Sequence, residues 1–319
     1  MTSEHPLGTL HFIDDKPVLH FERVLKHPPE KVWRAITEPA EMNRWFPAVV
    51  QAELRPGAEM LFSFGDDMVD LGSPYAHGEI LEYDAPKVYA FRWYDSVLRF
   101  ELLPADGGCR LVFSQALSNA GTWGDLPSTA RQGAGWDACL ALLEASLAGE
   151  SLVQPDFLER AERYVAQFGL GEGTVLPYDD GCVLRFERDL IQPAEDVWAT
   201  LTEGHDISDV PVRFTHPHVT PGPVTAAEPP RVLEYAWSDE NGHAAGRVRF
   251  ELGRQEPIGT RIVVTQTIPQ RLAHLRAISM AAWQVHLELL FAALFGDVRC
   301  PWPAERTGQL ARMYADRLA

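Results

Sequence analysis

Two histidine-containing patterns hold the residue types that could do chemistry. His77 and Glu79 lie two positions apart, so on a strand they would share one face, where an imidazole and a carboxylate can serve acid–base catalysis. No nucleophile or second base stands beside them, so we expect a surface pair. His216 and His218 would share a face in the same way, as two metal ligands do. A metal site needs at least a third ligand, and none is evident, so we expect neither a metal nor another cofactor.

Two glutamines occupy matching places at the ends of apolar, strand-like runs. Gln115 and Gln266 fall on the inward phase of the last strand that each half of the chain predicts. Because a buried amide needs hydrogen-bond partners, each could orient the polar end of a ligand or bond to a neighbouring backbone group. The sequence contains no G-x-G-x-x-G, P-loop or G-x-S-x-G motif, and it predicts no catalytic residue.

The net charge and the cysteine pattern disfavour several classes of function and location. The formal net charge of −17 argues against nucleic-acid binding, which relies on Lys and Arg, and it disfavours an anionic membrane surface. No signal peptide is recognisable, and no stretch approaches the roughly 18 apolar residues of a membrane-spanning helix. The four cysteines are scattered without a C-x-x-C pair, which is typical of reduced thiols. We therefore expect a cytoplasmic protein that does not insert into a membrane.

The chain contains an internal repeat. Residues 8–38 align without gaps onto residues 173–203, with 16 of 31 positions identical. The match resumes at Arg99-Phe-Glu-Leu102 and Arg249-Phe-Glu-Leu252, and again in the helical segments that carry Trp136 and Trp283. With a boundary in the glycine-rich stretch that follows residue 168, the repeat predicts two tandem domains, 1–170 and 171–319.

The second copy is the shorter one. Its tryptophans Trp198 and Trp237 are 39 residues apart, whereas their counterparts Trp33 and Trp93 are 60 apart, a difference of about one strand pair. The motif Trp45-Phe46-Pro47 is also replaced by Val210-Pro211-Val212. If only one copy keeps a ligand site, the first copy is therefore the expected one.

Each copy predicts the same succession of elements. A hairpin turns at Asp14-Asp15, and a helix begins at Pro28-Pro29. Antiparallel strands follow from about residue 49 to 115, although the phase of residues 77–83 is ambiguous because Ile80 and Leu81 compete for the inner face. An amphipathic helix over 128–149 ends the copy. These elements predict an α+β fold in which a curved antiparallel sheet grips a long C-terminal helix.

Three segments carry a family resemblance: FERVLKHPPEKVWRAITEPAEMNRWFP, HGEILEYDAPKVYAFRW and GWDACLALL. Together they resemble the START-like SRPBCC superfamily and, within it, the family named after the activator of the ninety-kilodalton heat-shock-protein (Hsp) ATPase. The resemblance covers about residues 8–149 and, with the departures above, 173–296. It implies two helix-grip domains with a mainly apolar cavity between sheet and helix. Relatives bind lipids, polyketides or other hydrophobic molecules, some are cyclases or aromatases, and a few eukaryotic members activate a chaperone.

We expect the first domain to bind a small hydrophobic or amphipathic ligand, without a conventional catalytic site. The alternative is that the same side chains only fill a core. Two other functions stay open: a chaperone cofactor or scaffold with a protein partner, and a cyclase-like enzyme using His77 and Glu79. The two domains either pair within the chain, as a fused homodimer would, or the chain itself dimerises. The residues expected to line the first cavity are Trp45, Phe62, Phe64, Phe91, Trp93, Phe100, Phe113, Gln115, Trp136 and Leu140.

Overall fold

The structure is a computed structural model that describes residues 6–63, 73–151, 157–207, 209–255 and 259–319. It divides into two compact units, residues 1–164 (unit 1) and 165–319 (unit 2), which are described separately. The division between the units falls inside the helix α5 (Phe157–Phe168). The domain boundary predicted after residue 170 lies just beyond this helix and stays a prediction.

Unit 1 is built on one antiparallel sheet of eight strands in the order β1-β2-β8-β7-β6-β5-β4-β3. Its strands are β1 (Thr9–Ile13), β2 (Lys16–Leu25), β3 (Val49–Ala52), β4 (Glu59–Ser63), β5 (His77–Asp84), β6 (Val88–Trp93), β7 (Ser96–Ala105) and β8 (Gly108–Ala116). Its helices are α1 (Pro29–Thr37), α2 (Pro39–Met42), α3 (Gly121–Gly124) and α4 (Thr129–Ala148), with short 3-10 turns η1 (Pro74–Ala76) and η2 (Leu126–Ser128).

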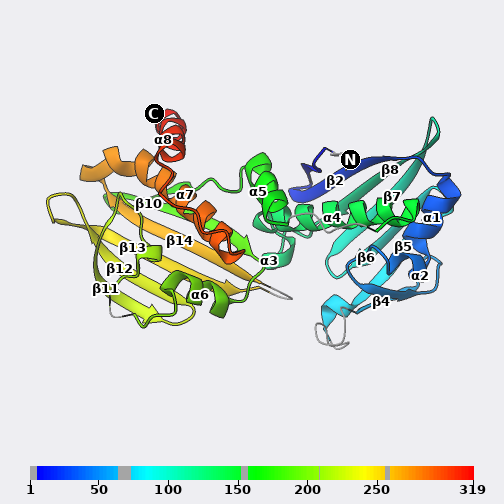
Figure 1. The fold of residues 1–319 in the computed structure, drawn as a ribbon, viewed down its shortest axis with the longest axis horizontal. Helices are drawn as coiled ribbons and strands as arrows, with labels where there is room; N and C mark the ends of the chain where they lie inside the picture. Colours follow the sequence, from blue (N-terminus) through cyan, green and yellow to red (C-terminus); the bar gives the residue numbers. More distant parts are fainter. Residues whose placement is uncertain (1–5, 64–72, 152–156, 208, 256–258) are drawn as a thin grey trace. The chain divides into compact units, whose positions relative to one another are not determined.

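The core of unit 1 lies between this sheet and α4, which runs across it (Figure 1). Alternation along β7 and β8 buries every second side chain, and the register pairs Phe100 with Phe113. Their rings stack at 4.5 Å between centroids. Trp136 and Leu140 of α4 are buried on the facing side, as the periodicity of that helix predicts. The predicted helix-grip fold is confirmed.

An irregularity in β5 explains why the sequence could not assign which of its side chains point inward. The pairing of β5 with β6 shifts register between Ile80 and Glu82, so the alternation of inner and outer side chains is interrupted there. Ile80 is fully buried, whereas Leu81 is 36% exposed. A regular period of two could not assign both residues because the strand itself is irregular.

Unit 2 repeats the plan with a six-stranded antiparallel sheet in the order β11-β12-β13-β14-β10-β9. In both units the last strand pairs with the second, β8 with β2 and β14 with β10. Within the described residues, unit 2 has no strands that correspond to β3 and β4. Its elements are β9 (Thr174–Tyr178), β10 (Gly181–Leu190), α6 (Ala194–Thr202), η3 (Val212–Phe214), β11 (Thr220–Glu228), β12 (Val232–Ser238), β13 (Ala244–Arg254), β14 (Thr260–Pro269), η4 (Gln270–Leu275), α7 (Arg276–Leu294) and α8 (Ala304–Leu318).

A tyrosine in the last helix of each copy ties that helix to the start of the copy. In unit 1 the Tyr164 hydroxyl donates to Asp137 Oδ2 at 2.7 Å and accepts from the Gly8 amide at 2.7 Å. In unit 2 the Tyr314 hydroxyl donates to Gln284 Oε1 at 2.7 Å, and the Gly173 amide donates to it at 3.2 Å. The same pair of tyrosine hydrogen bonds therefore occurs in both units, with the Gln284 amide of unit 2 in place of the Asp137 carboxylate of unit 1.

The helical stretch Gln270–Leu294, which comprises η4 and α7, is long and apolar enough to cross a membrane by length and composition alone. The sequence alone did not predict such a stretch. In the structure 67% of its most apolar window is buried inside the protein. Burial against the sheet of unit 2 accounts for its apolar character, since a core helix needs apolar residues around most of its surface.

Candidate functional site

A pocket lies in unit 2 beside α7, with a volume of about 520 Å³. Small-molecule sites typically have roughly 300–1,000 Å³. All thirteen residues that line it come from helices, turns and loops rather than from the sheet. They are Glu203, Val212, Arg213, Thr215, His216 and Pro217 from the segment after α6, His286, Leu289, Leu290 and Ala293 from α7, and Val298, Arg299 and Trp302 from the segment before α8.

The walls of the pocket are largely apolar. Leu289, Leu290 and Ala293 form one continuous stripe along α7. Two further lining residues, Val212 and Val298, are 81% and 61% exposed. Valines are usually buried, so two exposed valines at one pocket form an apolar surface that a ligand could cover.

His286 contributes a hydrogen-bond acceptor at this pocket. Its Nε2 lies 2.7 Å from the carbonyl oxygen of Arg213. Because a carbonyl oxygen can only accept, Nε2 carries the hydrogen and the neutral ring keeps a lone pair on Nδ1. The Nδ1 atom is buried and has no hydrogen-bond partner among the described residues.

His216 contributes the opposite function. The backbone N–H of His218 donates to His216 Nδ1 at 3.1 Å, so in the neutral ring Nε2 carries the hydrogen. This Nε2 is buried and also lacks a hydrogen-bond partner within the described ranges. A backbone hydrogen bond thus links His218 to the ring of His216. No group of three or more His, Cys, Asp or Glu side chains could hold a metal ion in the part of the chain that is described.

Both imidazoles are uncharged at neutral pH. Burial is the main cause that lowers the pKa of His286 to about 4; the hydrogen bond to the Arg213 carbonyl raises it in part, and the charge of Arg213 lowers it. Burial also lowers the pKa of His216 well below 6.5, with smaller contributions from His286 and His218. The donor and acceptor roles of the two rings are therefore those of their neutral forms.

Trp283 of α7 connects these groups. Its ring centroid lies 4.4 Å from that of His216 and 5.3 Å from that of His286. Its Nε1 donates to Gln266 Oε1 at 2.8 Å, while the buried Gln266 Nε2 has no hydrogen-bond partner in the described residues. Three buried polar atoms without partners thus surround one tryptophan. Such atoms are rare in folded proteins, and each of these three has less than 1 Å² of accessible surface.

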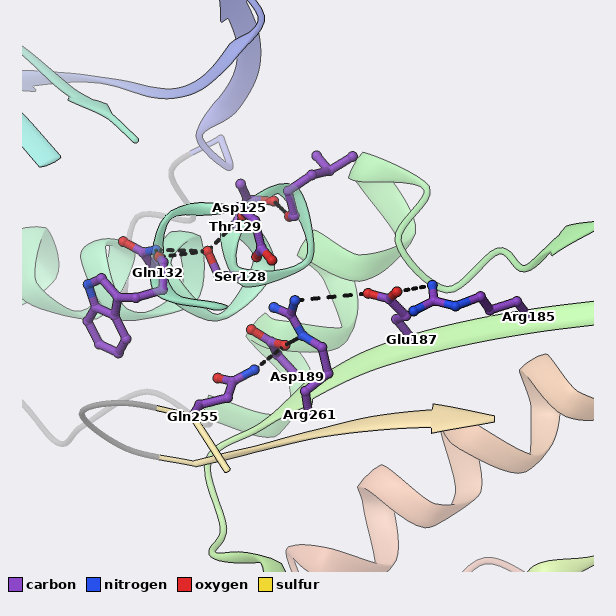
Figure 2. Close-up of polar contacts among 11 residues, drawn as sticks. Asp125, Ser128, Thr129, Gln132, Arg185, Glu187, Asp189, Gln255 and Arg261 are labelled. Carbon is purple, nitrogen blue, oxygen red and sulfur yellow. Dashed lines mark hydrogen bonds and ion pairs between the residues drawn. The ribbon is translucent and has the colours of Figure 1, made fainter. Parts of the chain in front are cut away.

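The corresponding groups of unit 1 form a closed chain. Trp136 Nε1 donates to Gln115 Oε1 at 2.7 Å, and Gln115 Nε2 donates to Gln132 Oε1 at 2.6 Å. Gln132 Nε2 then donates to Ser128 Oγ at 3.0 Å, as Figure 2 shows. The alignment that pairs Trp136 with Trp283 places Ser279 opposite Gln132, and a serine is too short to reach the amide. The same alignment places His286 opposite the thiol of Cys139.

The residues expected to line a first-unit cavity mostly touch one another. Phe46, which was not among them, fills the space between their rings. Its centroid lies 6.2 Å from Phe62, 5.4 Å from Trp93 and 5.7 Å from Trp136. Trp45, Phe62, Phe91, Phe100, Phe113, Gln115, Trp136 and Leu140 are buried, Trp93 is half-buried, and Phe64 lies outside the described residues.

Trp45 closes the core rather than forming a lid. It follows the short helix α2, and its Nε1 donates to the Ala35 carbonyl oxygen at 2.8 Å. Its ring lies 6.1 Å from Phe100 between centroids, and the side chain is 2% exposed. These contacts favour the interpretation that this segment closes the core.

The family comparison concerns unit 1. Residues 26–148 match the model of the family described as Activator of Hsp90 ATPase homolog 1-like protein. Residues 26–148 belong to this family. The match begins just before α1 and ends at the last residue of α4, so it contains the aromatic interior and the closed glutamine chain. The unit 2 pocket lies outside the matched segment of the Hsp90-activator-like family. Proteins of this fold bind ligands or act as cofactors.

Solved structures of similar fold come from several bacteria. A conserved protein of unknown function from Enterococcus faecalis is 21% identical, over 51% of this chain and 90% of that chain, with a TM-score of 0.43. CalU16 from Micromonospora echinospora is 21% identical, over 52% and 98%, with a TM-score of 0.38. A protein from Mesorhizobium loti is 24% identical, over 42% and 99%, with a TM-score of 0.34. No curated protein matches the chain.

The candidate acid–base pair of unit 1 does not form a site. His77 Nδ1 lies 3.2 Å from Glu59 Oε1, and Arg92 donates to Glu79 Oε2 at 3.1 Å. The two side chains are 47% and 46% exposed. The cyclase-like alternative needed both to point into a cavity. That requirement is not met, because on the exposed surface His77 contacts Glu59 and Glu79 pairs with Arg92.

A polar network that the sequence did not predict lies on the face of the unit 2 sheet opposite α7. Arg261 Nε donates to Asp189 Oδ1 at 2.7 Å, and Gln255 Nε2 donates to the same oxygen at 2.5 Å (Figure 2). Glu187 pairs with Arg185 two residues along β10. Alternate positions of β10 supply these side chains, so they lie apart from the pocket.

Proposed function

We propose that the protein binds a small amphipathic molecule in the pocket of unit 2. The observation that carries this proposal is an apolar pocket of about 520 Å³ whose lining includes two neutral imidazoles, His216 and His286. An apolar body would cover the α7 stripe and the two exposed valines. The imidazole rings would flank its polar end. Few convergent polar groups in an apolar pocket are what small-molecule sites have in common.

The energetics favour such a ligand over water alone. Covering one exposed valine contributes about 1.5–3 kcal/mol when its apolar surface leaves water. A ligand that covers both Val212 and Val298 gains this free energy at each side chain.

We place the ligand in unit 2 rather than in the first cavity that the sequence suggests. In unit 1 the ring of Phe46 stands among the other aromatic side chains, and the Gln115–Gln132 chain leaves its amides paired. In unit 2 the corresponding polar atoms are not paired within the described residues. On this proposal unit 1 has a structural role and unit 2 binds the ligand. The sequence had suggested the opposite, because only the first copy keeps the Trp45-Phe46-Pro47 motif.

A protein-interaction function is a second candidate, because both edge strands expose apolar side chains. Phe12 and Ile13 of β1 are 57% and 60% exposed, and Leu176 and Tyr178 of β9 are 45% and 50% exposed. An edge strand of this kind can pair with an extended segment of a partner. Affinity capture with wild-type protein and a Leu176→Lys variant tests it: a partner retained equally by both contradicts an edge-strand contact.

The ligand proposal is tested by blocking the pocket. Decanol is titrated into the full chain, with tryptophan fluorescence and native mass spectrometry as readouts. The Ala293→Trp variant fills the pocket and should abolish binding. The matched control is Ser146→Trp, which changes the equivalent position of α4 in unit 1 and should bind one decanol as the wild type does. If Ser146→Trp abolishes binding and Ala293→Trp retains it, the ligand belongs in unit 1 and the proposal is wrong.

A further inference from the structure

One arginine of the pocket lining has a backbone that is held from two sides. Arg213 belongs to the short turn η3, which follows α6. Its carbonyl oxygen accepts from His286 Nε2 of α7 at 2.7 Å. The next carbonyl oxygen, that of Phe214, accepts from the Tyr235 hydroxyl of β12 at 2.8 Å, and the side chains of His286, Phe214 and Tyr235 are all buried. The turn therefore fixes the base of the arginine side chain at the pocket.

The guanidinium group of Arg213 has donors that the protein does not use. Its Nε donates to Glu203 Oε1 at 2.8 Å, whereas its two Nη nitrogens donate to no acceptor among the described residues. The side chain is 31% exposed and neither Nη atom is enclosed, so both are accessible to a ligand. The two nitrogens belong to one rigid, planar fork whose spacing matches two oxygens of a carboxylate or a phosphate group.

The other charges at the pocket place a second cation beside Arg213. Arg299 also lines the pocket, and it pairs with Asp297, which is not part of the lining, at 2.6 Å. The two histidines of the lining are neutral, and Glu203 is its one acidic side chain within the described residues. Glu203 is 54% exposed, and an exposed ion pair of this kind contributes little to stability. An oxyanion could therefore bind the guanidinium beside Glu203 or in its place.

We infer that the ligand of the unit 2 pocket is an amphipathic anion whose carboxylate or phosphate group binds the two Nη nitrogens of Arg213. Its apolar part would cover the stripe of α7. An ammonium group, by contrast, would meet two arginines and would have Glu203 alone as a partner. The inference rests on the proposed function, because it concerns the same pocket, and it adds the charge of the ligand and the side chain that recognises it.

The test compares four probes with the same ten-carbon chain (about ten carbons fill such a pocket): decanol, decanoate, decyl phosphate and decylamine. In isothermal titration of the full chain at neutral pH, at least one of the two oxyanions should bind about 10-fold tighter than decanol, because hydrogen bonds to charged groups are the stronger ones. The tighter of the two identifies the oxyanion. Decylamine should bind more weakly than decanol. Added salt should weaken the binding of the oxyanions and leave decanol unchanged.

Three variants separate the fork from general charge. Arg213→Gln should lower the affinity for the oxyanion to that for decanol and leave decanol binding unchanged. Glu203→Gln should tighten oxyanion binding, since it removes a negative charge from the lining. The matched control is Arg92→Gln in unit 1, which removes an exposed arginine that also pairs with a glutamate. This control should bind all four probes as the wild type does.

The outcomes distinguish this inference from the proposed function. If decanol binds and Ala293→Trp blocks it, but neither oxyanion binds tighter than decanol, the pocket stands and the anion is wrong. Tightest binding of decylamine overturns the inference as well. An equal loss of oxyanion affinity in Arg92→Gln and Arg213→Gln would show an effect of net charge and also overturn it. If no probe binds, the inference and the proposed function both fail. The probe and salt series need no variant, so a variant that fails to fold does not prevent the test.

Discussion

His216 lies edge-on to Trp283, with ring centroids 4.4 Å apart and an interplanar angle of 76°. In unit 1 the equivalent tryptophan, Trp136, meets the phenyl ring of Phe46 at 5.7 Å. One aromatic partner is therefore exchanged for an imidazole between the two copies. This exchange, together with His286 in place of Cys139, adds two imidazoles to the interior of unit 2.

The stability of unit 2 should depend on pH through His286. Burial lowers the pKa of His286 from 6.5 to about 4, so between these values the unfolded chain binds a proton that the folded chain does not. Stability is then constant above about pH 7 and falls as the pH drops toward 4, by about 3 kcal/mol in all. Urea unfolding at a series of pH values measures this. In the His286→Cys variant the dependence should be weaker, and an unchanged slope would contradict the assignment.

Removing the glutamine amide should cost more in unit 1 than in unit 2. Gln115→Leu leaves both Trp136 Nε1 and Gln132 Oε1 without partners, at about 1–3 kcal/mol for each buried group. Gln266→Leu leaves only Trp283 Nε1 without its partner and removes an amide nitrogen that already lacked one. Denaturation midpoints of the two variants give the comparison. If Gln266→Leu lost more stability than Gln115→Leu, the difference between the variants would not come from these hydrogen bonds.

Removing the hydrogen-bond acceptor of the tyrosine should also cost more stability in unit 1 than in unit 2. Asp137 pairs with Arg23, both buried, and accepts from the Tyr164 hydroxyl. Asp137→Ala should destabilise unit 1 by about 3–5 kcal/mol, because it leaves a buried guanidinium without this carboxylate. Gln284→Ala removes the neutral bond to Tyr314 and a long bond of 3.5 Å to Glu288, and it should cost about 1–2 kcal/mol. Equal losses, measured by urea unfolding, would argue against a buried ion pair in unit 1.

Thiol labelling should distinguish one cysteine from the other three. Cys300 is exposed, whereas Cys109, Cys139 and Cys182 are buried. Burial also raises the pKa of Cys139 to about 12, so its thiolate is scarce. Ellman's reagent should therefore label one thiol in the folded chain and four after denaturation. Because Cys300 lies within the segment 298–302 that lines the pocket, decanol should slow its labelling; an unaffected rate would count against a ligand there.

Much of the fold was predictable because its signals are local. Alternating apolar residues and the stripe of Trp136 and Leu140 depend only on the period of a strand or helix, and the observed α4 differs from the predicted helix by one residue at each end. The bulge at Ile80 was not predictable, since a register shift between strands has no period of its own.

The candidate site was less predictable because it is made by tertiary contacts. Nothing in the spacing of His216 indicates that a residue seventy positions later on α7 comes beside the same tryptophan. A signal was nevertheless present: within the repeat, an apolar helix position changes from Cys139 to His286. The loss of the Trp45-Phe46 motif indicated a degraded copy, but the structure places a pocket in that copy.

Photo-crosslinking tests the location of the ligand most directly. A decanol analogue with a diazirine in its chain is irradiated with the full-length protein, and the labelled peptides are identified by mass spectrometry. We predict labels in the segments 212–217 and 286–302 of unit 2, and their loss in the Ala293→Trp variant. Labels confined to residues 45–140 of unit 1 would contradict a ligand site in unit 2.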